Sequence, residues 1–70
     1  MKIILSDHAK KRMKERNISF SQVQEAVDFS EYSVRKEGKV EIYKKISNKT
    51  LKVIYEEKDN YIKIITLMWK

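Results

Sequence analysis

The sequence predicts a small α+β domain in the order β-α-α-β-β-β-β, with two helices packed on one face of an antiparallel sheet. Apolar residues recur at helical spacing over residues 5–29 and at alternate positions from residue 31 onward. Polar turn segments divide the second half into short strands, which tend to pair with their sequence neighbours. The length of 70 residues allows one hydrophobic core, so we expect a single domain over residues 1–70.

A short strand at residues 2–5 is expected to open the fold and lead into the first helix. Ser6 or Asp7 can cap that helix, because a short polar side chain accepts the free N–H groups of the first turn. The helix should run to about Arg16, and Asn17 tolerates the left-handed conformation that ends helices. Its apolar stripe has the spacing i, i+4, i+8 and consists of Leu5, Ala9 and Met13.

The second helix is predicted from a capping box. Ser19-Phe20-Ser21-Gln22 matches the pattern S-x-x-Q, in which the serine and glutamine side chains each bond the other residue's backbone. Ile18 precedes the cap, where it could pack against Val23. The helix should end near Phe29 or Ser30. Its apolar face consists of Phe20, Val23, Ala26 and Val27.

From Glu31 onward the apolar period changes to two, which is typical of strands. Gly38 marks the first turn as a hairpin. The strands are separated by polar turns at residues 36–39, 47–49 and 58–60. The last strand, residues 61–68, is apolar on both faces, which predicts a central strand covered on both sides or on most of both.

Composition excludes several classes of site. The chain has no cysteine and one histidine, so we expect no disulfide, no metal site and no cofactor. The apolar run Ile3-Ile4-Leu5 is too short for a signal peptide, and no stretch approaches the roughly 20 apolar residues of a membrane span. These features predict a cytoplasmic protein. We also expect a monomer or homodimer when the protein is alone.

The net charge of +6 is unevenly distributed. Residues 1–16 carry +4, residues 17–34 carry −3, and residues 35–70 carry +5. Two basic segments therefore flank an acidic one. A basic surface attracts polyanions, of which nucleic acid is the commonest, although lysine-rich surfaces can serve solubility alone.

His8, Arg12 and Arg16 are spaced at i, i+4 and i+8, so they lie along one face of the first helix, beside its apolar stripe. Histidine suits proton transfer near neutral pH, and arginine presents a planar fork to phosphate oxygens. The same row has a structural explanation: His8 could order the first turn, and the arginines could pair with carboxylates of the sheet.

The sheet offers a second set of candidates. Tyr43 or Tyr55 could lie among its cations, an arrangement that suits single-stranded RNA because bases stack on rings while cations hold phosphates. Tyrosine also favours strands without any function. The cations that could project from the uncovered face are Arg35, Lys44, Lys52 and Lys63.

The segment from Ser6 to Ser19 resembles the opening motif H-A-x-x-R-x-x-x-R-x-I-[ST] of a widespread family of small bacterial and archaeal proteins. A second helix with Val23 and Val27 and a closing strand at residues 64–66 extend the resemblance over essentially the whole chain. Members often have Gly where this chain has Asn17, which suits the same backbone shape. That family is similar in topology to the RelE, ParE and BrnT toxins of toxin–antitoxin modules.

The resemblance implies a RelE-like domain that cleaves RNA without a metal and is neutralised by an antitoxin protein. It carries the family's histidine and two arginines onto His8, Arg12 and Arg16, with acid–base work for the first and phosphate binding for the others. RNA contacts are expected from Lys11, Arg35, Lys52 and Lys63. RelE-type ribonucleases usually place catalytic residues on the sheet and near the C-terminus, whereas this chain has no histidine, arginine or tyrosine after Tyr61.

Two alternatives stay open, because fold does not determine activity and ParE-like relatives share the fold without being ribonucleases. The first is a module that binds RNA without cleaving it. The second is a protein-interaction domain that uses an exposed strand edge or the region of Trp69.

Overall fold

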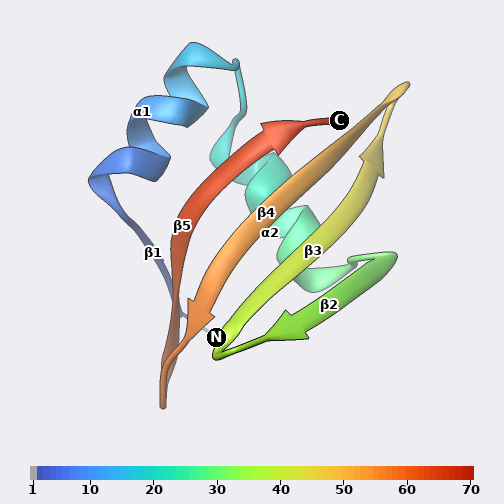
Figure 1. Cartoon of the computed structure of the whole chain (residues 1–70). Helices are drawn as coiled ribbons and strands as arrows, with labels where there is room; N and C mark the ends of the chain where they lie inside the picture. The colour runs from blue at the N-terminus through green and yellow to red at the C-terminus, as the bar shows by residue number, and fades with distance from the viewer. Residues whose placement is uncertain (1) are drawn as a thin grey trace.

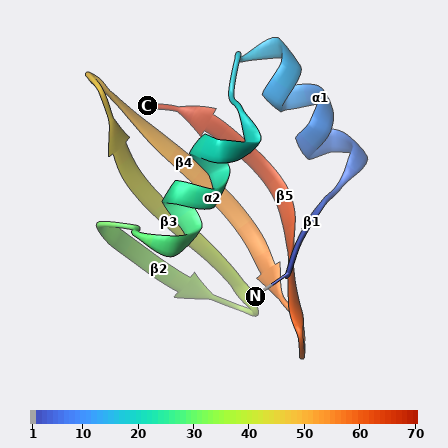
Figure 2. The same ribbon diagram turned by 180° about the vertical axis from the view of Figure 1, so that it is seen from behind.

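A computed structural model describes residues 2–70 (Figure 1). The predicted element order is confirmed. The elements are β1 (Lys2–Leu5), α1 (Asp7–Glu15), α2 (Phe20–Asp28), β2 (Tyr32–Lys36), β3 (Lys39–Ile46), β4 (Lys49–Glu57) and β5 (Tyr61–Trp69). Both helices lie on one face of the sheet, as the two opposite views show, so the other face is left uncovered (Figures 1 and 2). Within residues 2–70, no helix is long and apolar enough to cross a membrane.

The sheet is mixed, which corrects the expectation of a wholly antiparallel one. Its strand order is β1-β5-β4-β3-β2, and β2 to β5 form the predicted antiparallel meander. The first strand, β1, runs parallel to β5. The reason is the path of the chain: α1 follows β1 directly and packs beside the C-terminal half of β5, so β1 must run toward that same end.

The helix signals in the sequence are confirmed by the backbone. The Ser6 hydroxyl accepts the N–H of Ala9 at 3.0 Å and caps α1, and Asn17 has a φ of 55° just after that helix. Ser19 and Gln22 form both bonds of the predicted capping box at the start of α2. Short polar side chains therefore set where each helix begins, and a residue that tolerates positive φ turns the chain between them.

The hydrophobic core lies between the helices and the covered face of the sheet. It consists of Ala9, Ile18, Val23, Ala26, Val40, Ile42, Leu51, Val53, Ile62, Ile64 and Leu67. The prediction that β5 is an inner strand is confirmed, but its expected coverage on both faces is wrong. The helices cover one face, and on the other face Ile65 and Met68 are only half-buried.

Two local features shape the sheet. The β2–β3 hairpin turns at Glu37 and Gly38, which both have positive φ, 53° and 80°. In β5, the pairing with β4 shifts so that Ile54 faces Thr66 while Tyr55 faces Ile64, which leaves Ile65 as an extra residue. Such a bulge bends a sheet locally and increases its twist.

Candidate nucleic-acid interface

The strand register assigns each predicted RNA-binding side chain of the strands to one face of the sheet, because directly paired residues point to the same side. Lys52 is paired with Tyr43 and with Met68, on the uncovered face. Lys63 is paired with Glu56 and with Ile4 on that same face.

Three side chains expected on the uncovered face lie on the other one. Arg35 and Tyr55 are both paired with the core residue Val40, and Lys44 is paired with the core residue Leu51. All three therefore point toward the helix side of the sheet. The expectation failed because a period of two separates the faces but does not say which face the helices cover.

Arg35 has an ion-pair partner on the helix side of the sheet. Its guanidinium forms an ion pair with Glu57, with Nη1 2.5 Å from Oε1. The hydrogen bond from Arg35 lowers the pKa of the Glu57 carboxyl, and the pair is exposed. Tyr55 lies nearby, and burial raises the pKa of its phenol, which keeps it neutral. Arg35 is therefore separated from Lys52 and Lys63 by the sheet itself.

Tyr43 is the centre of a cluster on the uncovered face. The ammonium group of Lys52 lies 5.7 Å from the centroid of its ring, and that of Lys70 lies 5.9 Å away. The Tyr43 hydroxyl donates to Oε1 of Glu41 at 3.2 Å, and Lys52 lies 3.6 Å from the same oxygen. A second ring, Tyr32, has its centroid 5.6 Å from that of Tyr43 and is 63% exposed. We call Tyr32, Glu41, Tyr43, Lys52 and Lys70 the Tyr43 platform.

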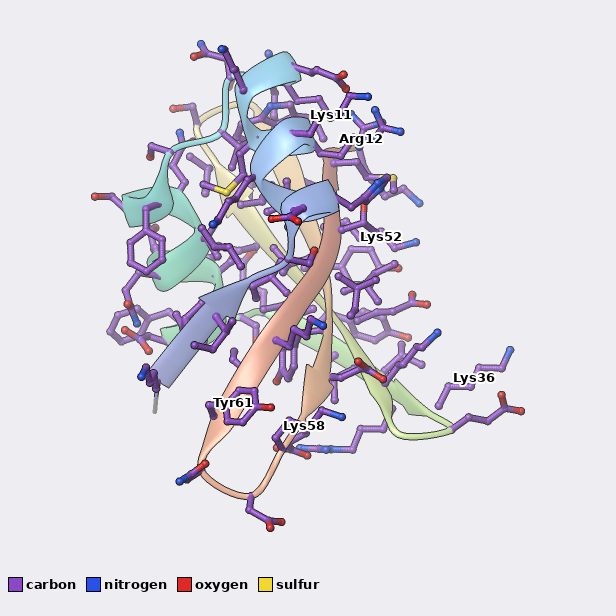
Figure 3. The ribbon with its side chains drawn as sticks, turned by 90° about the vertical axis from the view of Figure 1, so that its left-hand side faces the viewer. Lys11, Arg12, Lys36, Lys52, Lys58 and Tyr61 are labelled. Carbon is purple, nitrogen blue, oxygen red and sulfur yellow. The ribbon has the colours of Figure 1, made fainter. Side chains whose placement is uncertain are left out.

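Helix α1 presents cations to the same side of the molecule. Lys11 and Arg12 point in the same direction as Lys52 when the sheet is seen edge-on (Figure 3). Arg12 donates from Nη1 to Oε1 of Glu15 at 2.5 Å, and this hydrogen bond lowers the pKa of the Glu15 carboxyl. The pair is largely exposed, so a phosphate group could compete with the carboxylate for Arg12.

The three residues of the predicted catalytic row have different surroundings. His8 is exposed, and among residues 2–70 its side chain has no hydrogen-bond or ion-pair partner. Arg12 is paired with Glu15. Arg16 is half-buried and donates from Nη1 to the carbonyl oxygen of Leu67 at 2.7 Å.

The contact of Arg16 belongs to the edge of β5. Because β1 pairs only with residues 61–64, the rest of β5 has no neighbouring strand on that side, and α1 lies along it. The Ser6 hydroxyl donates to the carbonyl oxygen of Ile65 at 3.2 Å, and Arg16 donates to that of Leu67. The two ends of α1 thus satisfy backbone acceptors of an otherwise open edge. Spacing alone could not distinguish this structural role of Arg16 from phosphate binding.

Part of the Tyr43 platform is predictable from the sequence, and the rest is not. Lys52 and Tyr43 were predicted, and Glu41 could have been found because it is two residues from Tyr43 on the same strand. Tyr32 and Lys70 join the platform through strand pairing and long-range folding, which no local pattern signals. Lys63 lies on the uncovered face nearer Tyr61, beside a hollow lined by Lys2, Ile4, Asn60, Tyr61 and Lys63.

Metal-ligand clusters are absent from the part of the chain that the structure describes: no three of its histidine, aspartate or glutamate side chains gather closely enough to hold an ion. The uncovered face instead combines aromatic rings with ammonium groups, and Arg12 of α1 adds a guanidinium group on the same side of the molecule. These groups suit a single-stranded nucleic acid, because its bases can stack on the rings and its phosphates can contact the cations.

Comparison with known proteins gives one family. Residues 5–69 match a family described as a domain of unknown function (DUF4258). The match runs from the end of β1 to the end of β5 and so includes both helices and the whole Tyr43 platform except Lys70. No curated protein and no solved structure gave a significant match. The chain belongs to the DUF4258 family.

Proposed function

We propose that this protein is a RelE-like, toxin-type endoribonuclease that holds single-stranded RNA on the uncovered face of its sheet and cleaves it without a metal. The observation that carries the proposal is the Tyr43 platform, in which two ammonium groups lie within 6 Å of one tyrosine ring and a second, exposed ring stands beside it. Rings of this kind stack on bases of any sequence, while the cations hold the backbone.

The charges around the platform support RNA as its partner. Lys52 is the only platform cation with an ion-pair contact among residues 2–70, and its 3.6 Å distance from Glu41 is long. Lys11 and Arg12 extend the positive surface onto α1 (Figure 3). A strand of RNA lying across the sheet from Tyr32 toward α1 would meet rings first and cations next.

For cleavage, we assign the proton transfer to His8 and phosphate binding to Arg12. Neutral His8 would take the proton of a ribose 2′-hydroxyl, whose oxygen attacks the adjacent phosphorus. The bond from phosphorus to the 5′-oxygen breaks, and that oxygen takes a proton from solvent or from the Lys52 ammonium. The products are a 2′,3′-cyclic phosphate and a 5′-hydroxyl. Arg12, released from Glu15, would stabilise the charge that develops on the phosphoryl oxygens.

The likeness to RelE, ParE and BrnT toxins supports a protein partner as well. The element order and the packing of both helices on one face agree with the topology that the resemblance implies. We propose that an antitoxin binds at the outer edge of β2, where Phe29 and Tyr32 are 67% and 63% exposed. An unpaired edge of this kind accepts an added strand. In this proposal the chain works in the cytoplasm.

The experiment is incubation of the purified protein with RNA in the presence of a chelator. The wild type is compared with His8→Ala, Arg12→Ala and Lys52→Ala, and with Lys58→Ala as a control in the β4–β5 turn. Cleavage by the wild type and the control, lost in His8→Ala while its circular dichroism is unchanged, is the expected result. Equal cleavage by His8→Ala would remove that residue from the chemistry.

One observation favours RNA binding without cleavage as a second candidate function. No side chain among residues 2–70 orients His8, whereas catalytic histidines are usually held by a hydrogen-bond partner. On this alternative the platform holds RNA in the same way, and all of the variants leave RNA intact. Binding that weakens in Lys52→Ala, with no cleavage by the wild type, would identify this case.

A further inference from the structure

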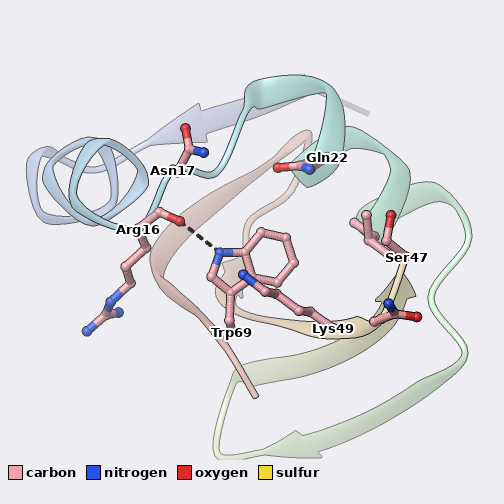
Figure 4. Close-up of a pocket in the computed structure, with 8 residues that line it drawn as sticks. Arg16, Asn17, Gln22, Ser47, Lys49 and Trp69 are labelled. Carbon is pink, nitrogen blue, oxygen red and sulfur yellow. Dashed lines mark hydrogen bonds between the residues drawn. The ribbon is translucent and has the colours of Figure 1, made fainter.

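We propose that a pocket beside Trp69 binds one nucleobase of the RNA, as a second site distinct from the Tyr43 platform; this inference rests on the proposed action on RNA. The pocket is a hollow of about 340 Å³ at the end of β5 (Figure 4). It is bounded by the segment that joins α1 to α2 and by the β3–β4 turn. The lining residues that a base would meet include Asn17, Gln22, Ser47, Asn48, Lys49 and Trp69.

The aromatic wall of the pocket is held in place. Trp69 packs against the core and donates its indole N–H to the carbonyl oxygen of Arg16 at 2.8 Å, which fixes the orientation of the ring (Figure 4). A ring that is already fixed loses little conformational freedom when a base stacks on it. The ammonium of Lys49 lies 5.5 Å from the ring centroid. A stacked base would displace this flexible cation, which could then meet the phosphate of the same nucleotide.

The polar side chains around the ring have the capacity to bond the edge of a base. Asn17, Ser47 and Asn48 have no side-chain hydrogen bond among residues 2–70. Gln22 uses its Oε1 to accept the backbone N–H of Ser19, which leaves its amide N–H groups available. Amides and hydroxyls both donate and accept, as the mixed edge of a nucleobase requires.

The pocket and the platform lie on opposite sides of one strand end. Trp69 and Lys70 are consecutive residues, so in an extended chain they point to opposite faces. Lys70 reaches the Tyr43 ring on the uncovered face, and its backbone pairs with Thr50 through two hydrogen bonds of 2.7 and 3.4 Å. Single-stranded RNA that leaves the platform at Lys70 can therefore turn around the end of β5 and place its next base on Trp69.

The test uses the fluorescence of Trp69, which is the only tryptophan of the chain. The full-length protein is titrated with each of the four nucleoside 5′-monophosphates and with ribose 5-phosphate, and free N-acetyltryptophanamide corrects for absorption by the nucleotides. We expect saturable quenching by at least one nucleotide and none by ribose 5-phosphate, because the sugar phosphate has no base to stack. Equal quenching by the nucleotides and by ribose 5-phosphate, or no quenching by any of these compounds, would overturn the inference.

Variants at the two sites, with a control elsewhere, separate the pocket from the platform. Lys49→Ala should weaken nucleotide quenching about tenfold, and Lys52→Ala should leave it unchanged while weakening the binding of a labelled oligonucleotide. Asn48→Ala is the second pocket variant, and Lys58→Ala is the matched control. If the wild type binds the oligonucleotide with unaltered Trp69 emission and still cleaves RNA in chelator, the pocket inference fails and the proposed function stands. If nucleotides quench Trp69 but RNA stays intact in chelator, the pocket stands and the ribonuclease proposal fails.

Discussion

The indole N–H of Trp69 donates to the carbonyl oxygen of Arg16 at 2.8 Å, which joins the last residue of β5 to the residue that ends α1. The guanidinium of Arg16 returns a contact to the same strand, to the carbonyl oxygen of Leu67 at 2.7 Å. Two hydrogen bonds in opposite directions therefore attach the C-terminal end of α1 to the sheet. More than 50 positions of sequence separate the bonded groups, so the pair closes the fold over a long range.

Arg16→Ala should destabilise the protein by about 2 kcal/mol, because a half-buried charged hydrogen bond is lost and the Leu67 carbonyl keeps no partner. Trp69→Phe should cost about 1 kcal/mol through the loss of the indole N–H. Urea denaturation followed by circular dichroism measures both. The double variant should lose less stability than the sum of the two single losses, because both hydrogen bonds act at the same contact between α1 and β5. Full additivity would mean that the two contacts are independent.

Lys52→Ala should weaken the binding of single-stranded RNA and reduce the salt dependence of the binding constant by about one phosphate contact. Arg35→Ala removes the same charge from the opposite face of the sheet and should leave the affinity and the salt slope unchanged. Fluorescence anisotropy with a labelled oligonucleotide at several salt concentrations measures both quantities. Equal losses of RNA affinity in the two variants would mean that binding depends on the net charge of the protein and not on the Tyr43 platform.

Tyr43→Leu should weaken RNA binding by roughly 1 to 3 kcal/mol, because the ring supplies the stacking surface while leucine keeps the apolar volume. Tyr43→Phe retains the ring and should bind almost as well, since it loses only the hydrogen bond to Glu41. The same anisotropy assay compares them. A larger loss in the phenylalanine variant would assign the role to the hydroxyl group instead of the ring.

Ser19→Ala should cost about 1 kcal/mol of stability, because it removes the side-chain acceptor for the backbone N–H of Gln22 and disrupts the capping box. Ser21→Ala makes the same chemical change two residues later, at an exposed position inside α2, and should change stability by less than about 0.5 kcal/mol. Thermal or urea unfolding distinguishes the two. Similar stability losses in the two variants would show that the capping box contributes nothing to stability.

The Arg35–Glu57 ion pair should make part of the protein's stability depend on pH. Its hydrogen bond lowers the pKa of Glu57 from the ordinary value of 4.5, so the pair stabilises the fold above pH 4.5, and this contribution is lost as the pH falls through the lowered pKa. Arg35→Ala should return the pKa of Glu57 toward 4.5, which carboxyl NMR titration measures. The pKa of Glu15 is the internal control, because its partner is Arg12. A Glu57 pKa that does not rise would contradict the pairing.

Local patterns in the sequence predicted the secondary structure because helix caps and strand periods act between residues a few positions apart. Ser6 and Ser19 start the helices as expected, and Asn17 adopts the left-handed conformation expected of it. The change of period at Glu31 marked the beginning of the meander. These signals place the helical row of His8, Arg12 and Arg16 and the four later strands, so much of the candidate site was present in the sequence.

The sequence by itself therefore determined the elements and their order, and the tertiary structure decided which side chains meet. The parallel pairing of β1 follows from how α1 packs, and the position of Arg35 opposite Val40 follows from strand register. The contact of Lys70 with Tyr43 also forms only when β5 closes onto the meander. The physical reason is that register and chain closure depend on burying the whole core at once, which no window of neighbouring residues contains.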